Sequence, residues 1–234
     1  MLLYNTKSRT IEEFIPHDSK EVKLYTCGPT VYSYAHIGNL RTYISEDILE
    51  KGLKYLGYDV KYASNYTDIN PKITKAAETL GMTEREVANK FIKAYEEDLK
   101  NYNCSNIDYR PRVINYLDDI FNFISKLIEK DYAYVVDGDV YFRVSKIKDY
   151  GILSNQSIEE LISGSRVDID EKKENPLDFA LWRKTTEGET FTSPWGEGIP
   201  GWHTECVVMI NKLFGDKIDI HAGGVDLKFP HHDN

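Results

Sequence analysis

Lys23-Leu-Tyr-Thr-Cys27-Gly-Pro29 sets the fold class, because an apolar run closed by Gly-Pro predicts a β-strand that ends in a turn. A helix is predicted just downstream, since apolar residues there recur mostly three or four positions apart: Ile37, Leu40, Ile44, Ile48, Leu53 and Leu56. Gly57 stands where a helix commonly ends, and residues 60–66 predict a second strand. This order predicts a βαβ unit of a parallel sheet, whose ligands bind at the carboxyl ends of the strands.

Further elements are predicted on the C-terminal side of this unit, and the composition changes there. The further predicted elements are helices at about 83–101 and 112–130, a hairpin of residues 133–136 and 140–144 around Asp137-Gly138, a helix at 202–214, a short strand at 218–221 and a turn at Gly223-Gly224. Residues of about 145–200 are rich in Gly, Ser, Lys and Glu and show little periodicity. The sequence therefore predicts an α/β core interrupted by an insertion of roughly residues 110–195.

Length and composition exclude several classes of protein. The 234 residues include 29 Lys+Arg against 38 Asp+Glu, a net charge of −9, and 41% are hydrophobic. The chain has no apolar run near the roughly 18 residues that a bilayer span needs, and its start lacks the apolar core of a signal peptide. Three cysteines are too few for a secreted disulfide scaffold, and the acidic balance argues against a DNA-coating protein. We expect a soluble intracellular protein without a membrane partner.

The helix that follows the first strand offers an anion site. Neither a dinucleotide fingerprint nor a P-loop glycine pattern is present; the segment His36-Ile-Gly38-Asn39 stands there instead. Backbone N–H groups at a helix N-terminus attract anions, His36 adds a donor for phosphate oxygens, and Gly38 lets a flat ring approach the backbone. The competing interpretation is that His36 only caps the helix or lies on the surface.

Dispersed cysteines and histidines form a second candidate site, for a metal. Zinc takes about four nitrogen, sulfur or oxygen ligands. The candidates lie near predicted strand ends: Cys27, His203, Cys206, His221, His231 and His232. His203 and Cys206 are three residues apart and would share a helical face, as would Trp202 and Cys206, whereas His231 and His232 diverge. The competing interpretation is a set of buried free thiols and ordinary histidines, as we expect for Cys104.

Taken together, these segments resemble one family. The motifs are Cys27-Gly-Pro-Thr-Val-Tyr, His36-Ile-Gly-Asn39, Asn65-Tyr-Thr-Asp-Ile69, Leu181-Trp-Arg, Ser193-Pro-Trp-Gly-Glu-Gly, Pro200-Gly-Trp-His-Thr-Glu-Cys206 and His221-Ala-Gly-Gly-Val-Asp226-Leu-Lys-Phe-Pro-His231-His232. Their order and spacing closely resemble the N-terminal part of cysteinyl-tRNA synthetases, which are class I aminoacyl-tRNA synthetases.

The resemblance implies a Rossmann-like catalytic domain of the class I (HUP) type with an inserted connective domain. Residues 1–110 would form its first half, 111–195 the insertion, and 196–234 the start of a truncated second half. The implied activity is ATP-dependent activation of L-cysteine and its transfer to tRNA(Cys), in the cytoplasm and by a monomer.

The resemblance also implies ligands. One Zn²⁺ would be held by Cys27, Cys206, His231 and a glutamate four residues beyond His231, while His203 is not a ligand in the family. Zinc binds a thiolate far better than a serine hydroxyl and could select the substrate by its sulfur. Residues implied to line the amino-acid pocket are Thr67, Trp202 and His221.

For ATP with Mg²⁺, the resemblance places His36 and Asn39 on the phosphates as the catalytic pair. Thr30 and Gly38 would also contact ATP, and Gly224 and Asp226 would surround the adenosine. The cysteine carboxylate would attack the α-phosphate in line, without a covalent enzyme intermediate.

Several features depart from the family pattern. Asn39 replaces a histidine, Asn70-Pro71-Lys72 replaces two acidic residues and a lysine, and Ala222 replaces a glycine. A Lys-Met-Ser-Lys-Ser loop and the regions that contact tRNA are missing, so we expect an N-terminal fragment that does not complete aminoacylation alone. The rival interpretations are a related ligase joining cysteine to an amino sugar, and a zinc- or nucleotide-binding module without catalysis.

Overall fold

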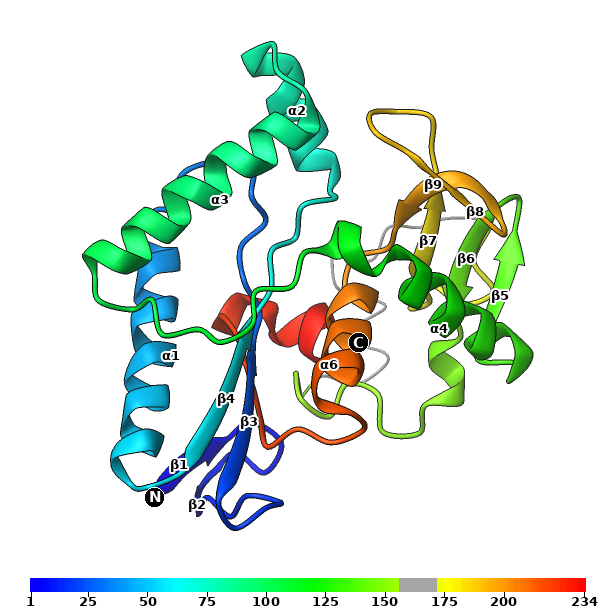
Figure 1. Ribbon diagram of the computed structural model, residues 1–234. Helices are drawn as coiled ribbons and strands as arrows, with labels where there is room; N and C mark the ends of the chain where they lie inside the picture. Colours follow the sequence, from blue (N-terminus) through cyan, green and yellow to red (C-terminus); the bar gives the residue numbers. More distant parts are fainter. Residues whose placement is uncertain (156–171) are drawn as a thin grey trace.

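The computed structural model describes residues 1–155 and 172–234 (Figure 1). Its helices are α1 (Ile37–Tyr55), α2 (Pro71–Leu80), α3 (Glu84–Asn101), α4 (Leu117–Glu129) and α6 (Thr204–Phe214). Its strands are β1 (Leu2–Asn5), β2 (Thr10–Glu13), β3 (Glu21–Thr26), β4 (Asp59–Ser64), β5 (Ala133–Val136), β6 (Asp139–Phe142), β7 (Phe179–Lys184), β8 (Phe191–Ser193), β9 (Gly196–Pro200) and β10 (Ile220–Ala222). In these parts of the chain, no helix is both long and apolar enough to cross a membrane.

The predicted βαβ unit is confirmed. Strands β3 and β4 pair in parallel, with Val22 opposite Val60, and α1 connects them and ends before Gly57, whose φ is +93°. The late strand β10 also pairs with β3 in parallel, so the sheet order is β10-β3-β4. The next strand in the sequence, β4, pairs with one edge of β3, and the last strand, β10, pairs with its other edge. The carboxyl end of β3 is therefore a topological switch point, where open α/β sheets bind ligands.

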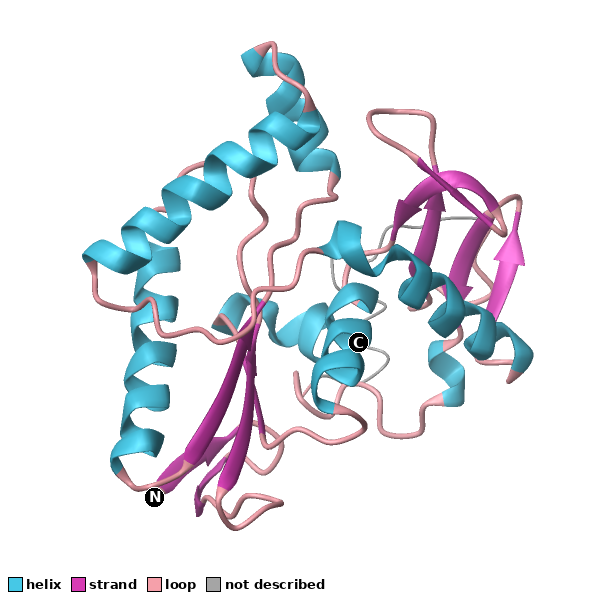
Figure 2. Cartoon of the chain, viewed as in Figure 1, coloured by secondary structure: helices cyan, strands magenta, loops and turns pink. Residues whose placement is uncertain are grey.

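Both faces of this sheet are covered, as a parallel sheet requires. Val22 and Leu24 are fully buried with Leu53 of α1, whereas Tyr25 belongs to a cluster with Cys206 and Met209 of α6. Figure 2 shows α1 and α6 on opposite sides of the strands. Because both helices fix the strands from either side, the loops beyond β3 and β4 start from rigid positions.

A separate antiparallel sheet of order β5-β6-β7-β9-β8 occupies the region after α4. The predicted hairpin is β5 and β6, with Val135 opposite Val140. Strands β7, β8 and β9 were not predicted, because they are only three to six residues long and lie in a stretch with little periodicity; β9 also contains two glycines, Gly196 and Gly198. Part of the weakly periodic stretch, residues 156–171, lies outside the described residues.

The apolar core runs from the parallel sheet into the antiparallel one. Ile120 and Ile124 of α4 and Trp182 of β7 are fully buried in the same cluster as Tyr25 of β3. The division of the chain at residues 110 and 195 stays a prediction, and β9 continues to Pro200, past the second of these boundaries.

Three local predictions need correction. The helix expected at 202–214 begins at Thr204, because His203 has φ +92° and cannot be helical, so neither Trp202 nor His203 shares a helical face with Cys206. Helix α2 was missed although Asn70 caps it and Pro71 opens it. The hairpin of β1 and β2 was missed too, because its exposed strands carry no clear alternation.

Candidate active site

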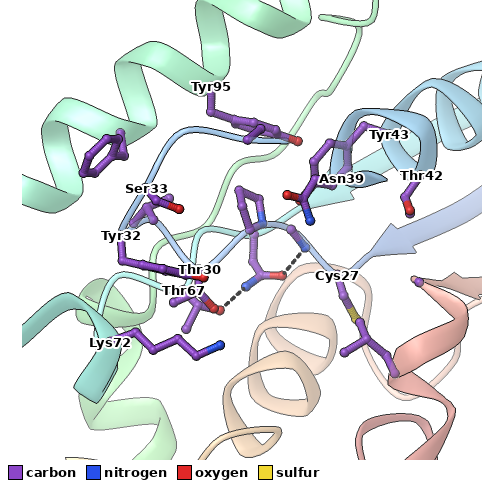
Figure 3. Close-up of a pocket in the computed structure, with 18 of the residues that line it drawn as sticks. Cys27, Thr30, Tyr32, Ser33, Asn39, Thr42, Tyr43, Thr67, Lys72 and Tyr95 are labelled. Atoms are coloured by element: carbon purple, nitrogen blue, oxygen red, sulfur yellow. Dashed lines mark hydrogen bonds between the residues drawn. The ribbon is translucent and has the colours of Figure 1, made fainter. Parts of the chain in front are cut away.

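A cavity of about 250 Å³ opens at the carboxyl ends of β3 and β4 (Figure 3). Ten of the residues implicated by the sequence line it: Cys27, Thr30, His36, Asn39, Thr67, Trp202, Cys206, Gly224, Asp226 and His231. His221 lies beside it, within hydrogen-bonding distance of Cys27, and Gly38 lies behind the ring of His36. Residues far apart in the sequence thus meet at the topological switch point.

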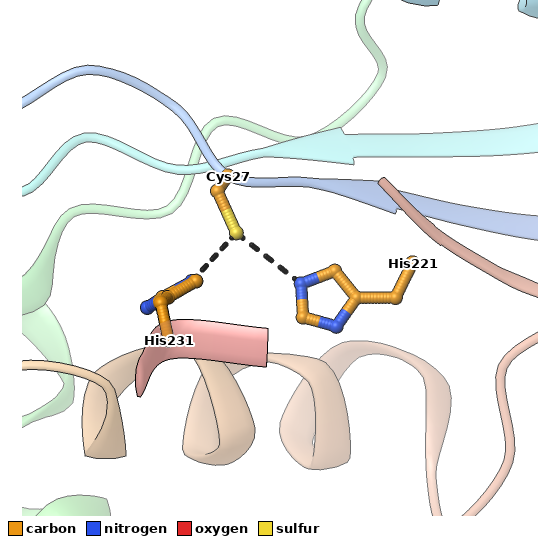
Figure 4. Close-up of side chains that lie close together, drawn as sticks. All are labelled: Cys27, His221 and His231. Atoms are coloured by element: carbon orange, nitrogen blue, oxygen red, sulfur yellow. Dashed lines mark hydrogen bonds between the residues drawn. The ribbon is translucent and has the colours of Figure 1, made fainter. Parts of the chain in front are cut away.

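The thiol of Cys27 is the centre of a cluster of sulfur and imidazole groups (Figure 4). Its Sγ lies 2.8 Å from Nε2 of His231 and 3.2 Å from Nε2 of His221, and the three ligand atoms lie within 4.8 Å of one another. Sulfur and imidazole nitrogen are the donors that zinc prefers, so one ion between these groups could contact all of them. The donor set therefore fits zinc.

Cys206 of α6 lies next to this cluster. Its thiol is buried, and a hydrogen bond with Cys27 holds the pKa of Cys206 well below its usual range while raising that of Cys27. Cys206 lies outside the group of donor atoms within 4.8 Å of one another, which consists of Cys27, His221 and His231. Its place as a zinc ligand therefore stays a prediction, and His221 is the donor that the geometry adds. Cys104, which is equally buried, donates instead to the carbonyl of Tyr102 at 3.3 Å and lies outside the cluster.

His203 contacts the cluster from behind. Its Nδ1 lies 2.5 Å from Nδ1 of His231, and burial lowers the pKa of His203 to about 3, so its ring is neutral. In the tautomer of His231 that carries its proton on Nδ1, this N–H donates to His203 and the lone pair of Nε2 points toward Cys27. The sequence could not reveal this contact, because it depends on the positive φ that turns His203 away from α6.

The N-terminus of α1 forms the opposite wall. His36 is the N-cap, and its Nδ1 accepts from the N–H groups of Gly38 at 3.0 Å and Asn39 at 3.4 Å. In return the side-chain oxygen of Asn39 accepts from the N–H of His36 at 3.2 Å. The structure thus shows the capping interpretation of His36, and the contact of His36 with phosphate stays a prediction. Capping occupies Nδ1 only, so Nε2–H and the side-chain amide N–H groups of Asn39 are left as donors.

Gly38 has a structural reason to be glycine. A Cβ at this position would lie 2.8 Å from Cε1 and 2.9 Å from Nδ1 of His36. Any larger residue would push the imidazole out of its cap. The glycine thus orients His36, in addition to any contact it makes with a ligand.

The ends of β3 and β4 are tied together beneath the cavity. The N–H of Gly28 donates to the side-chain oxygen of Asn65 at 3.1 Å, and the amide of Asn65 donates to the hydroxyl of Thr67 at 3.2 Å. The backbones of Thr30 and Thr67 also form a parallel bridge. Asn65 is thus a residue of the site that the sequence pointed to only as part of a motif.

Gly28→Ala is expected to destabilise the fold by about 1–3 kcal/mol, because the new Cβ would lie 1.7 Å from the backbone oxygen of Asn65 and would separate the two strand ends. Urea unfolding measures the change. Gly52→Ala in the middle of α1 is the matched control, since its Cβ would meet only Met1 at 3.5 Å and should stabilise the helix slightly. Equal stability of the two variants would contradict the close approach at Gly28.

Comparisons with known proteins agree with this architecture. Residues 13–234 match the family model described as tRNA synthetases class I (C) catalytic domain. The cysteine–tRNA ligase of Anoxybacillus flavithermus is 53% identical over 233 residues, which are 99% of this chain and 50% of that protein. The cysteine–tRNA ligase of Geobacillus sp. strain WCH70 is 54% identical over the same shares of the two chains. The chain spans about half the length of these relatives.

Among solved structures, Mycobacterium tuberculosis methionyl-tRNA synthetase in complex with methionyl-adenylate superimposes with a TM-score of 0.65 at 14% identity. The match covers 89% of this chain and 52% of the other. A likeness at this identity concerns the fold alone, which is that of class I synthetases. Together with the family match over nearly the whole chain, it shows that this protein belongs to the family of class I (C) tRNA synthetase catalytic domains.

Proposed function

We propose that this chain provides the amino-acid and ATP sites of a cysteine–tRNA ligase, which acts in the cytoplasm and transfers activated cysteine to tRNA(Cys). The observation that carries the proposal is the cluster of Cys27, Cys206 and His231 at the floor of a class I synthetase cavity. Such a donor set suits a substrate thiol, and the curated relatives that match the chain are named as cysteine–tRNA ligases.

In this proposal Cys27, Cys206 and His231 hold one Zn²⁺, which supplies a soft Lewis acid for the substrate sulfur. His221 and Trp202 form the sides of the pocket around that position; the ring of Trp202 stacks on His203 at 4.5 Å between centroids. Thr67 is held by Asn65 and faces the same cavity. A serine would fill nearly the same volume, so shape alone discriminates poorly and the sulfur must be recognised.

The activation step is assigned to the wall formed by α1. The carboxylate oxygen of cysteine attacks the α-phosphorus of ATP, a new C–O–P bond forms, and Mg²⁺-bound pyrophosphate leaves with the electrons of the broken P–O bond. Nε2–H of His36 and the amide of Asn39 donate to phosphate oxygens as negative charge develops on them. Asn39 is uncharged, so it contributes a hydrogen bond where a cationic histidine would contribute a charge. Gly224 and Asp226 line the end of the cavity assigned to the adenosine.

The proposal is tested by binding of two stable adenylate mimics, cysteinyl- and seryl-sulfamoyl adenosine, to the zinc-loaded chain. We expect the cysteinyl compound to bind at least about a hundredfold more tightly, and the preference to collapse when a chelator removes the metal. Equal affinity for both compounds would overturn the substrate assignment. Charging of tRNA(Cys), compared with ligation to an amino-sugar acceptor, then distinguishes the ligase from its amino-sugar-joining alternative; this assay uses the longer protein of which we expect the chain to be a part. A chain that binds zinc but neither mimic would be a module without catalysis.

A further inference from the structure

We propose that Lys72, which faces the cavity from the first turn of α2, binds the phosphates of ATP opposite His36 and Asn39. The inference rests on the proposed function and adds a binding residue to it. Lys72 is the one lysine or arginine among the described residues that line the cavity. Every other lining side chain is neutral, acidic or an imidazole or thiol, so Lys72 brings the permanent positive charge there.

The position of Lys72 is fixed by the start of its helix. Asn70 caps α2 and its side-chain oxygen accepts from the N–H of Lys72 at 3.0 Å, while Pro71 occupies the first helical position. The ammonium group lies 5.3 Å from the centre of the Tyr32 ring, which belongs to the loop between β3 and α1. An aromatic face holds an ammonium group in place without neutralising its positive charge.

The ammonium group of Lys72 is available to a ligand. Within the described parts of the chain, no aspartate or glutamate lies within ion-pair distance of Lys72. The residues just before it are Asn70 and Pro71, and neither carries a charge. Because no carboxylate pairs with the ammonium in these parts of the chain, its charge stays available to the cavity that Lys72 lines.

The geometry favours a polyphosphate as the partner. Figure 3 shows Asn39 of α1 and Lys72 of α2 on opposite sides of the cavity, with Thr30 and Thr67 between them. A phosphate chain in this space would receive hydrogen bonds from α1 on one side and a positive charge from α2 on the other. An ammonium attracts phosphate as a point charge and does not demand the paired geometry that an arginine would. The chain as a whole has a net charge of −9, so a local cation matters for admitting an anion.

Binding of Mg·ATP and of adenosine, each measured by isothermal titration calorimetry, tests the inference. Lys72→Met keeps the apolar stem and should weaken Mg·ATP about tenfold while leaving adenosine unchanged. It should also make ATP binding less sensitive to salt, and Lys72→Arg should restore part of the affinity. Lys75→Met is the matched control, since Lys75 is an exposed lysine one turn further along α2 that does not line the cavity. Thermal unfolding of each variant checks that the fold is intact.

The outcomes separate this inference from the proposed function. If the unmodified chain binds neither Mg·ATP nor adenosine, the proposed function fails. If it binds both and Lys72→Met behaves like Lys75→Met, the function stands and the role of Lys72 is overturned. Equal weakening of ATP and adenosine would also overturn it, because a contact to phosphate cannot act on adenosine. An unchanged affinity for ATP together with weaker binding of an RNA acceptor-stem oligonucleotide would assign the charge to RNA and equally reject the proposal.

Discussion

Cys206→Ser and Cys27→Ser are each expected to reduce bound zinc from one ion per chain to a small fraction of that amount, whereas Cys104→Ser should retain it. A serine hydroxyl stays protonated at neutral pH and is a hard, weak ligand for zinc, so each exchange removes a thiolate from the cluster around His231. The affinity should fall by at least about a hundredfold, since ligand loss exceeds the effect of altering an outer contact. Elemental analysis after dialysis and competition with a chromogenic chelator measure the content and the affinity.

Cys104→Ser is a closely matched control for the other two variants, because all three cysteines are buried and free. Cys104 lies in the loop that follows α3, where its thiol donates to the Tyr102 carbonyl. A general effect of replacing a buried thiol would therefore appear in all three variants, and a ligand effect in two. Equal zinc content in Cys104→Ser and Cys206→Ser would refute the ligand assignment. Substitution with Co²⁺ adds a second measurement, since sulfur-to-metal charge-transfer absorption should weaken in Cys27→Ser and Cys206→Ser alone.

The sequence predicted the parts of the fold whose signals are local. Strand β3, helix α1 and strand β4 follow from an apolar run, a helical period and two glycines, and together they place Cys27 at the switch point. Strands β7 to β9 could not be predicted in this way. They form by pairing with other strands, and the backbone of β7 approaches Gly198 of β9 and Gly201 just after β9 closely. A Cβ there would lie 2.1 Å from the oxygen of Arg183 and 1.8 Å from that of Ala180, respectively.

The candidate site residues that belong to sequence motifs could be named in advance. The residues whose position depends on tertiary structure could not. Cys27, Cys206 and His231 come from three separate segments, and the resemblance alone brought them together before the fold was known. The contact of His203 with His231 depends on one backbone angle, and the position of Lys72 depends on α2, which apolar periodicity does not predict. In that helix the signal was present: Asn70 followed by Pro71 is a typical start.

Helix α1 was predicted correctly, but the apolar residues that predicted it do not all lie on its buried face. Ile37, Ile48 and Leu56 are 76%, 64% and 53% exposed. The buried face instead carries Leu40, Tyr43 and Leu53 with three acidic residues, Glu46, Asp47 and Glu50. Asp47 and Glu50 form ion pairs with Lys51 and Lys54 one turn further along the helix. Hydrophobic periodicity cannot identify such a buried face, because carboxylates in a sequence predict a solvent-exposed position.

Glu46 is the exception among these acids, and it should make stability depend on pH. No lysine or arginine of the described residues pairs with Glu46, which is 5% exposed. Burial raises its pKa from 4.5 to about 8, an effect that the neighbouring Thr26 hydroxyl offsets in part. The folded protein therefore holds a proton on Glu46 that the unfolded chain releases above pH 4.5.

The sign of the pH dependence follows from this raised pKa. Below pH 4.5 both states are protonated and the folded state has its full stability from this group. As pH rises toward 8, ionisation of the unfolded chain withdraws that stability, at up to about 1.4 kcal/mol per pH unit. Glu46→Gln keeps the shape but cannot ionise, so the difference in unfolding free energy between variant and parent should grow by about 3–5 kcal/mol in favour of the variant from pH 4.5 to pH 8.

Urea unfolding at several pH values measures this difference, and taking it between two pH values cancels any change in packing caused by the amide. Titration of the zinc ligands and of other carboxyl groups is common to parent and variant and cancels as well, provided that both are studied without metal. Glu97→Gln, at an exposed position of α3, is the control and should follow the parent at every pH. Parallel pH profiles for the parent and Glu46→Gln would mean that Glu46 ionises as readily in the folded protein as in the unfolded chain. In that case the buried face of α1 would have to admit water beside Tyr43 and Tyr62, contrary to its burial in the structure.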